Sequence, residues 1–492
     1  MPHTVAARAP EAVRRPAGFG IVRGAIRFVF QRVVGIYFRE VEIAGDVPRP
    51  DTTARLFAAN HVNGLVDPIL VLTQAPCPIS PVAKSTLWKI PGLKWLLDSV
   101  DAVAIVRKRD DPTKTAKDND AIFERVGAHL AGRGNILIFP EGTSHSEPHL
   151  IALRTGAGRM LARAREAGGR DLTFQAVALE FDAREVFRSR TLLLFGPVRA
   201  LDDVATAHPD GDLAQAITDA IREDLSELLV EGATWEERIL VVRAAEMFAN
   251  GDPALGTTAR SLAQLNELGR RIEAARALLK ASAPDAVAAI EARVTAYWSA
   301  LQDASASDEL IARFAARTLA AAAGDEVGAE PTVAPEYIAW GAVRVLTLPL
   351  ALLGMLLYWL PYQLPRAVTR RLHGDPDVTS TYKLGVGLLV HPLWASILIT
   401  AAFLELATPL AILLAVLVVT SPFAALPWLD HWDRLSARLE LFGSGEHRRE
   451  RLVALARERA GLMQALEEAR ARVEGTLVAA ASPRASAHPA QA

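Results

Sequence analysis

Residues 55–68, which read RLFAANHVNGLVDP, decide the fold that we predict for this chain. They open with a short apolar run, Arg55–Ala59, that has the length and composition of a buried β-strand. A polar loop follows. Asp67 and Pro68 then mark the start of a helix, because Asp favours the N-cap and Pro the first helical position. A strand, a loop and a helix in this order are typical of an α/β layer.

The same alternation of strand and helix continues to about residue 200. Further strands are expected at 79–83, 102–106, 135–139, 173–180 and 191–195, with helices near 68–76, 85–98, 114–132 and 154–168. The pattern predicts fold class α/β, a mixed or largely parallel sheet flanked by helices, followed by a helical region and a C-terminal transmembrane hairpin. The expected divisions are an N-terminal arm (1–50), the α/β domain (51–205), a helical region and linker (206–335), membrane segments (336–430), and a charged helix with a disordered tail (431–492).

The prediction of membrane segments rests on three apolar stretches, near 342–364, 384–404 and 407–429. Each is close to the roughly 20 residues that span a bilayer. Basic residues gather in the loop 365–383 and again after residue 429, and the positive-inside rule assigns both groups to the cytoplasm. We therefore expect a hairpin of the second and third stretches, with the first in the interface; three full spans are the alternative. A bacterial inner membrane with a cytoplasmic catalytic domain is the expected location.

The N-terminal arm contains arginines at regular intervals among apolar residues. Arg23, Arg27 and Arg32 are spaced four or five residues apart. This pattern is typical of an interfacial amphipathic helix with a basic face toward anionic lipid. The alternative is an ordinary helix that covers the soluble domain.

Composition excludes several classes of function. A net charge of −2 argues against nucleic acid as the main partner, since binders of the phosphate backbone usually carry a basic excess. The single cysteine, Cys77, excludes an internal disulfide. The sequence has no zinc-type spacing of Cys and His.

His61 and Asp67 are the candidate catalytic pair. A hydroxyl that attacks a substrate needs a base to take its proton, and His is the usual choice near neutral pH. A carboxylate beside the imidazole would fix its tautomer and stabilise its protonated form. His61 lies in the loop directly after the strand at 55–59, and Gly64 would let that loop fold back toward Asp67. The alternative is that Asp67 serves only as a helix cap.

A second motif, FPEGTSHS at residues 139–146, follows the apolar strand at 135–139. It is thus expected at the carboxyl edge of the sheet, where open α/β sheets bind ligands. Gly142 permits a close approach of the backbone, and Thr143 and Ser144 offer donors to a phosphate. Glu141 belongs to the same motif. A plain β-turn is the alternative interpretation.

Cationic residues follow several of the predicted strands. Lys84 comes after the strand at 79–83, and Arg107 comes after the strand at 102–106. Arg154 starts the helix after the second motif. Arginine suits a phosphate because its planar fork donates two parallel hydrogen bonds. We predict that Lys84, Arg107 and Arg154 help to bind a phosphate. Arg188 and Arg190 are weaker candidates for the same patch.

At these motifs the chain resembles the glycerolipid acyltransferase superfamily, whose members carry a His–Asp motif and a Pro-Glu-Gly-Thr/Gly-Ser motif. Most members separate the His and the Asp by four residues, whereas five residues separate them here. That spacing resembles the fungal-type glycerol-3-phosphate/dihydroxyacetone-phosphate acyltransferases and their bacterial relatives. The resemblance extends to Phe187-Arg188-Ser189-Arg190 and to Thr381-Tyr382-Lys383. It covers about 50–200 well and 338–400 loosely.

The resemblance implies an O-acyltransferase of phospholipid biosynthesis in which His61 is the base and Asp67 orients it. The acyl group would pass directly from acyl-CoA or acyl-carrier protein, as co-substrate, to the 1-hydroxyl of glycerol 3-phosphate or dihydroxyacetone phosphate. Neither a metal nor an acyl-enzyme would be involved. Arg107 and the motif residues Glu141, Gly142, Thr143 and Ser144 would hold the acceptor's phosphate, and membrane lipid would surround the product.

Two other functions compete with this interpretation. Within the same chemistry, the acceptor would instead be lysophosphatidate or another lysophospholipid. In a different class, the chain would be a non-enzymatic membrane adaptor on an acyltransferase scaffold. The intact set of His61, Asp67, Glu141 and Ser144 argues against the adaptor. A hydrolase is disfavoured too, because the sequence has no recognisable nucleophile motif.

Overall fold

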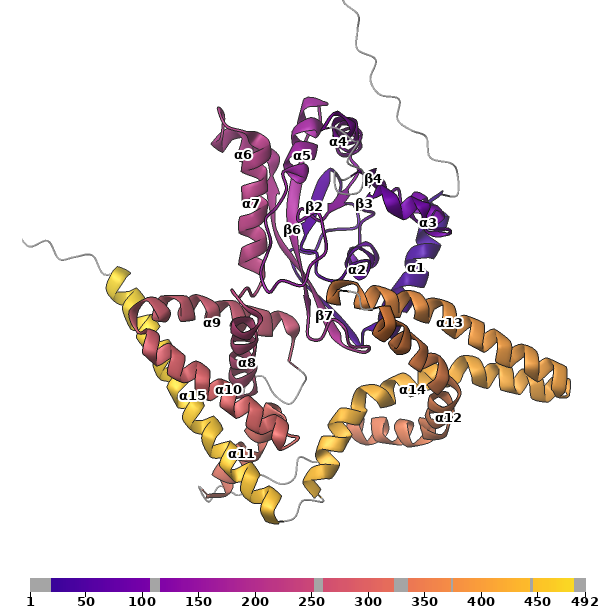
Figure 1. Cartoon of the computed structure of the whole chain (residues 1–492), viewed down its shortest axis with the longest axis vertical. Coiled ribbons are helices and arrows are strands. Elements are labelled where there is room, and N and C mark those ends of the chain that lie inside the picture. The colour runs from indigo at the N-terminus through magenta and orange to yellow at the C-terminus, as the bar shows by residue number, and fades with distance from the viewer. Residues whose placement is uncertain are drawn as a thin grey trace, which may run out of the picture. The chain divides into compact units, whose positions relative to one another are not determined.

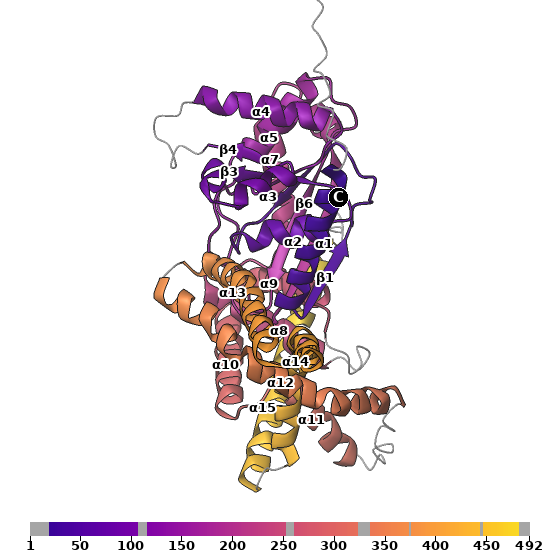
Figure 2. The same cartoon turned by 90° about the vertical axis from the view of Figure 1, so that its right-hand side faces the viewer.

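The computed structural model describes residues 19–106, 116–251, 260–322, 335–372, 375–442 and 446–481 (Figures 1 and 2). It separates into two compact units. The first contains the described residues up to Leu229 together with Gly354–Pro422, and the second contains Val230–Leu353 and the residues from Phe423 onward. The boundary expected at residue 205 therefore falls inside the first unit.

The first unit is built on a seven-stranded sheet with the order β1-β7-β6-β2-β5-β3-β4. The strands are β1 (Glu40–Gly45), β2 (Arg55–Ala59), β3 (Ser80–Lys84), β4 (Val103–Ile105), β5 (Ile136–Ile138), β6 (Thr173–Phe181) and β7 (Arg190–Ala200). β6 and β7 pair antiparallel, and every other pair is parallel. The predicted mixed sheet is confirmed, and six of its strands were expected from the sequence.

The strand that the sequence analysis missed is β1, which lies at an edge and pairs with β7. Its six residues read EVEIAG, and three of them are exposed. An edge strand buries little, so a short run with two charged residues lacks the apolar signal of the central strands. The arm expected at 1–50 thus contributes a strand to the domain.

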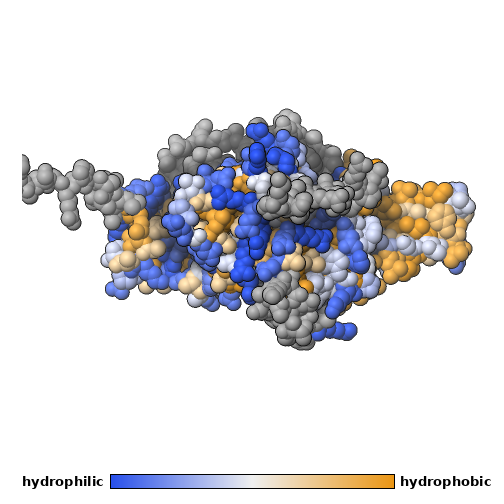
Figure 3. Space-filling model, turned by 90° about the horizontal axis from the view of Figure 1, so that it is seen from above, coloured by the Kyte–Doolittle hydropathy of each residue, from blue (hydrophilic) through white to orange (hydrophobic). Residues whose placement is uncertain are grey.

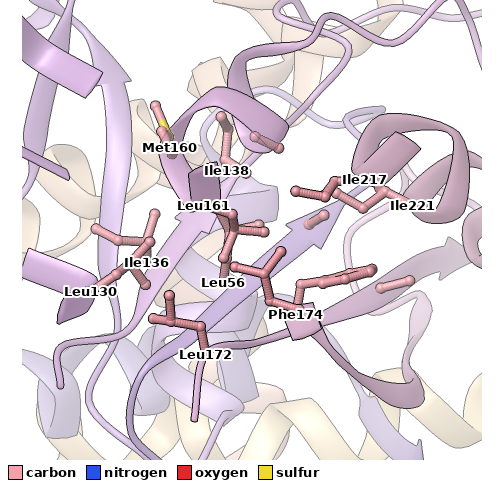
Figure 4. Packing of buried hydrophobic residues seen from close by; sticks show 14 of the residues in the cluster. Leu56, Leu130, Ile136, Ile138, Met160, Leu161, Leu172, Phe174, Ile217 and Ile221 are labelled. Carbon is pink, nitrogen blue, oxygen red and sulfur yellow. The ribbon is translucent and has the colours of Figure 1, made fainter. Parts of the chain in front are cut away.

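Two hydrophobic cores lie on opposite faces of the sheet because side chains alternate along each strand. Leu56 and Ala58 of β2 face one core with helices α4 (Ala116–Ala131), α5 (Gly156–Glu166), α6 (Leu201–Ala207) and α7 (Leu213–Leu228). Figure 4 shows this packing. Phe57 and Ala59 face the other core with α1 (Phe19–Tyr37) and α2 (Val66–Gln74). η1 (Ser85–Lys89) and α3 (Leu93–Ser99) connect β3 to β4.

Two of the three arginines of α1 contact the protein, whereas Arg32 is exposed and lies over the ring of Phe28. The choice between an interfacial helix and one that only covers the domain stays a prediction. The Arg27 Nη2 group donates to the carbonyl of Ala75 at 2.6 Å, and Arg23 donates to the carbonyl of Ile79. Gln31 donates to Thr73 at 2.8 Å. These side chains satisfy carbonyls at the C-terminal end of α2 and in the segment just after it. The exposed side of α1 carries large apolar residues, Ile21, Val22, Phe28 and Val29, beside Arg32.

The second unit is helical, as expected for its sequence. Its helices include α8 (Trp235–Gly251), α9 (Leu262–Ser282), α10 (Pro284–Asp303), α11 (Asp308–Ala322) and α15 (Glu446–Ala481). A core formed by Met247, Val294, Tyr297, Ile311 and Leu462 joins four of them.

Three helices are long and apolar enough to cross a membrane, by length and composition: α12 (Pro335–Leu372), α13 (Pro376–Glu405) and α14 (Thr408–Phe442). Figure 3 shows hydrophobic residues gathered on the segment at the right, where α13 and the start of α14 lie. The hairpin of the second and third stretches stays a prediction, because all three helices meet the length requirement.

Candidate active site

Three loops meet at the carboxyl edge of the sheet. β2 pairs in parallel with both β5 and β6, so the segments after these strands leave from the same edge. Two hydrogen bonds join the three segments directly. The His145 N–H donates to the carbonyl of His61 at 3.1 Å, and Arg184 Nη1 donates to the carbonyl of Val62 at 3.0 Å. The loop after β2, which carries His61, is therefore held from both sides.

His61 and Asp67 form the pair that the sequence predicted. His61 Nδ1 lies 2.9 Å from Asp67 Oδ2. The same oxygen accepts the N–H groups of Val62 at 2.8 Å and of Asn63 at 2.7 Å, and Asp67 is fully buried. Asp67 is not the helix cap that we expected, because α2 starts at Val66 and its N-cap is Leu65. Its carboxylate reaches back instead, to the amides of the loop.

This geometry sets the tautomer of His61. Because a carboxylate oxygen accepts from Nδ1, the proton lies on Nδ1 and Nε2 keeps its lone pair. The imidazole also stacks on the ring of Phe139, with centroids 4.1 Å apart and planes 23° apart. Its side chain is 18% exposed. A fixed ring, an available Nε2 and a carboxylate behind Nδ1 are the features of a general base.

Glu141 is buried and holds the two motifs together. Its Oε1 accepts the N–H of His61 at 3.4 Å, and its Oε2 forms an ion pair with His145 Nε2. Burial raises the pKa of Glu141, and the neighbouring His145 and His61 oppose that rise. The Glu147 N–H donates to His145 Nδ1 at 3.1 Å, so Nε2 is the nitrogen that carries a proton toward Glu141.

The turn after Glu141 packs closely against Arg154. Gly142 has φ +75°, and a Cβ there would lie 2.8 Å from Arg154 Nε. The Arg154 N–H donates to the carbonyl of Pro140 at 2.8 Å. Thr143 Oγ1 donates to the carbonyl of Ser144 at 3.3 Å. Only glycine fits this position, and it lets the exposed Arg154 lie along the turn.

The remaining predicted cations have different positions. Lys84 is the exposed last residue of β3, which pairs with β5 and therefore ends at the same edge. Arg107, the predicted phosphate contact, lies outside the described residues. Arg188 does not join the edge: its Nη1 donates to the carbonyls of Gly35 at 2.7 Å and Ile36 at 3.0 Å, at the end of α1. Arg190 pairs with Asp182 at 3.2 Å.

Sequence reasoning missed His145 and Arg184. His145 stands four residues after Glu141, so its spacing to a motif carboxylate was visible in the sequence. Arg184 follows β6 with no motif around it, and only the sheet order shows that β6 lies beside β2. Among the described residues, no group of three or more His, Cys, Asp or Glu residues is placed to hold a metal ion.

Residues 40–180 match the family model described as Acyltransferase. This region is an acyltransferase domain. A lyso-ornithine lipid O-acyltransferase of Pseudomonas aeruginosa is 32% identical to this chain over 142 residues, which make up 29% of this chain and 48% of the relative. Glycerol-3-phosphate O-acyltransferase 2 of Saccharomyces cerevisiae is 30% identical over 142 residues, or 26% of this chain and 18% of the relative.

Among solved structures, the 1-acyl-sn-glycerophosphate acyltransferase PlsC of Thermotoga maritima matches 43% of this chain and 81% of its own, at 15% identity and a TM-score of 0.30. The match to this chain spans about half of the length of one curated relative and less than a fifth of the other. The family assignment therefore applies to the acyltransferase domain.

Proposed function

We propose that this chain transfers a fatty acyl group from acyl-CoA or acyl-carrier protein to the 1-hydroxyl of glycerol 3-phosphate or dihydroxyacetone phosphate. The observation that carries the proposal is the His61–Asp67 pair, 2.9 Å apart at the carboxyl edge of an acyltransferase domain. The carboxylate sits behind Nδ1, so Nε2 is left to act on a hydroxyl.

The reaction follows from this arrangement. His61 Nε2 takes the proton of the acceptor hydroxyl while the oxygen attacks the carbonyl carbon of the thioester. A C–O bond forms, the C–S bond breaks, and the proton passes from the imidazolium to the departing thiolate. Asp67 stabilises the imidazolium while it exists, as the carboxylate does in related triads. The reaction needs no covalent acyl-enzyme.

The acceptor's phosphate would bind beside this pair. Gly142 brings the backbone of its turn close to the exposed guanidinium of Arg154, and Thr143 and Ser144 add hydroxyls. Lys84 would add a second cation at the same edge, and we assign Arg107 to the same phosphate. A phosphate acceptor agrees with the name of the yeast relative, Glycerol-3-phosphate O-acyltransferase 2.

A second acceptor class is a lysolipid. The Pseudomonas relative, a lyso-ornithine lipid O-acyltransferase, shares 32% identity with this chain over 142 residues. The same base and the same proton path would serve a lysolipid hydroxyl, so the two proposals differ in the acceptor and not in the mechanism.

An acyl-transfer assay tests both proposals. Purified full-length protein in liposomes is offered labelled acyl-CoA, or acyl-carrier protein, with glycerol 3-phosphate, dihydroxyacetone phosphate, lysophosphatidate or lyso-ornithine lipid in turn. We expect turnover with one of the first two, and a loss of about 10²–10⁴-fold in the His61→Ala variant. The matched control is His208→Ala, at the end of α6 and away from the three loops, which should keep wild-type turnover.

Turnover with a lysolipid alone would move the protein to the second acceptor class. Full turnover in His61→Ala would overturn the mechanism. Silence with every donor and acceptor would favour the non-enzymatic adaptor.

A further inference from the structure

The first turns of α13, a helix long and apolar enough to cross a membrane, contact the loop that carries His61. Both belong to the first unit. The Leu65 N–H donates to Thr381 Oγ1 at 2.9 Å. Gly64 has φ +46°, and a Cβ at this position would lie 2.6 Å from Thr381 Oγ1 and 3.0 Å from the carbonyl of Asp377. Gly64 and Leu65 lie in the connection between His61 and Asp67, so α13 contacts the chain between the two.

A second set of hydrogen bonds reaches the same loop from α13 through the segment after β6. Ser380 Oγ donates to the carbonyl of Arg184 at 2.6 Å, and Lys383 donates to the carbonyl of Glu185. Arg184 Nη1 in turn donates to the carbonyl of Val62 at 3.0 Å and to that of His145 at 3.5 Å. Arg184 therefore links α13 to both motifs.

The two ends of α13 differ in how deeply their side chains are buried. Ser380 is completely buried, Asp377 is 6% exposed, and Leu384 belongs to the core that contains Phe57 and Leu70. Further along, the exposed residues include large apolar ones, among them Leu389, Leu393 and Leu404. One end of the helix is thus packed into the acyltransferase domain, and the other presents the surface that a bilayer would cover.

We propose that Thr381, supported by Ser380 and Lys383, is a positioning residue for the His61–Asp67 pair, and that the seating of α13 sets the geometry of the catalytic loop. Of the five residues between His61 and Asp67, Gly64 and Leu65 make the contact with α13. Any shift of α13 along its axis would move the acceptor of the Leu65 amide and the connection between base and carboxylate. The catalytic readout of this inference rests on the proposed acyl transfer.

The kinetic test compares three variants of the full-length protein in liposomes. Thr381→Val keeps the shape of the side chain and removes the acceptor, so we expect kcat to fall by roughly 10- to 100-fold with little change in KM for the acyl donor, because a small misplacement of a catalytic group has effects of this size. Thr381→Ser restores the acceptor and should recover most of kcat. Thr379→Val makes the same chemical change on the same turn of α13 and should behave as wild type. Wild-type kcat in Thr381→Val would overturn the proposal.

A second measurement does not depend on turnover. Hydrogen–deuterium exchange of a peptide covering residues 61–70 reports the Leu65 amide, which loses its partner in Thr381→Val. We expect faster exchange of this peptide in Thr381→Val, and wild-type exchange in Thr381→Ser and Thr379→Val. Unchanged exchange in Thr381→Val would overturn the positioning contact even if the enzyme is active. If the protein acylates none of the acceptors, the proposed function fails, but faster exchange still supports the contact.

Discussion

Asp67 of the first unit and Asp308 of the second are both buried, and their carboxylates have different partners. Asp308 of α11 pairs with the guanidinium of Arg459, with Nε 2.8 Å from Oδ1 and Nη2 3.2 Å from Oδ2. Tyr297 donates to Oδ1 at 2.7 Å and Asn250 to Oδ2 at 2.9 Å. Both oxygens are thus satisfied, and the carboxylate joins α8, α10, α11 and α15. Its charge partner is an arginine, which stays protonated throughout the accessible pH range.

Among the described residues, the ion-pair partner of Asp67 is His61. One oxygen collects three donors, from His61, Val62 and Asn63, while Oδ1 is buried without a hydrogen-bond partner among the described residues. Its partner is an imidazole, which can gain and lose a proton near neutral pH. The difference distinguishes a structural carboxylate from a candidate catalytic one: the first is neutralised permanently, and the second has a charge that is balanced only when His61 is protonated.

The largest effects are expected when each carboxylate loses its charge. Turnover should suffer in the Asp67 variant, and stability in the Asp308 variant. Asp67→Asn should lower kcat by about 10²–10⁴-fold, because the amide cannot stabilise an imidazolium. Asp308→Asn leaves the guanidinium of Arg459 buried without its charge partner and should lower the free energy of unfolding by about 3–5 kcal/mol. Turnover and denaturant unfolding of both variants check this.

The two variants also serve as controls for each other. Asp308→Asn should keep nearly the wild-type kcat per folded molecule, and Asp67→Asn should lose less stability than Asp308→Asn. If Asp67→Asn is the less stable of the two and keeps its kcat, Asp67 is a structural residue and the contrast between the units is wrong.

A substitution of His145 tests whether the second motif depends on the buried Glu141–His145 pair. We expect it to have a smaller effect on stability than Asp308→Asn. His145→Ala removes the partner of the buried Glu141 and should lower the free energy of unfolding by about 1–3 kcal/mol. In the background of Glu141→Gln the same change should have a smaller effect, because a neutral amide needs no charge partner. A double-mutant cycle on unfolding measures this coupling. Additive effects of the two changes would show that the ion pair contributes nothing to stability.

The sequence predicted the central part of the fold well, for a physical reason. β2, β5 and β6 are buried on both faces, so Arg55–Ala59 and Thr173–Phe181 read as continuous apolar runs. β1 was missed because an edge strand carries little of that signal. The arginines of α1 were assigned by one prediction to a lipid surface, since spacing along a helix shows that residues share a face but not what the face contacts.

The site was predictable where its residues lie inside one motif, and not where the fold brings separate segments together. His61 and Asp67 are six positions apart, and their pairing could be proposed from the sequence alone. Arg184 and Thr381 contact the same loop from 120 and more than 300 positions away, which only the sheet order and the packing of α13 determine. The resemblance marked Thr381-Tyr382-Lys383, but the sequence did not show that Thr381 contacts the loop of His61.

The pH dependence of stability gives the smallest expected effect and tests the state of Glu141. Burial raises the pKa of this carboxyl above its ordinary value of 4.5, so the native state holds the proton more tightly than the unfolded state. Between pH 4.5 and the raised pKa, the native state binds more protons, and its stability falls as the pH rises. One such group changes the free energy of unfolding by at most about 1.4 kcal/mol per pH unit.

Glu141→Gln cannot titrate, so the stability of the wild type relative to this variant should decrease as the pH rises from 4.5 toward neutrality. Denaturant unfolding of both proteins across that range measures the difference, in which titrating groups distant from Glu141 cancel; His145, its ion-pair partner, contributes to it. A relative stability that increases with pH would mean the reverse, a native pKa below the ordinary value. The hydrogen-bond donors and His145 would then favour the charged carboxylate of Glu141 more strongly than burial disfavours it.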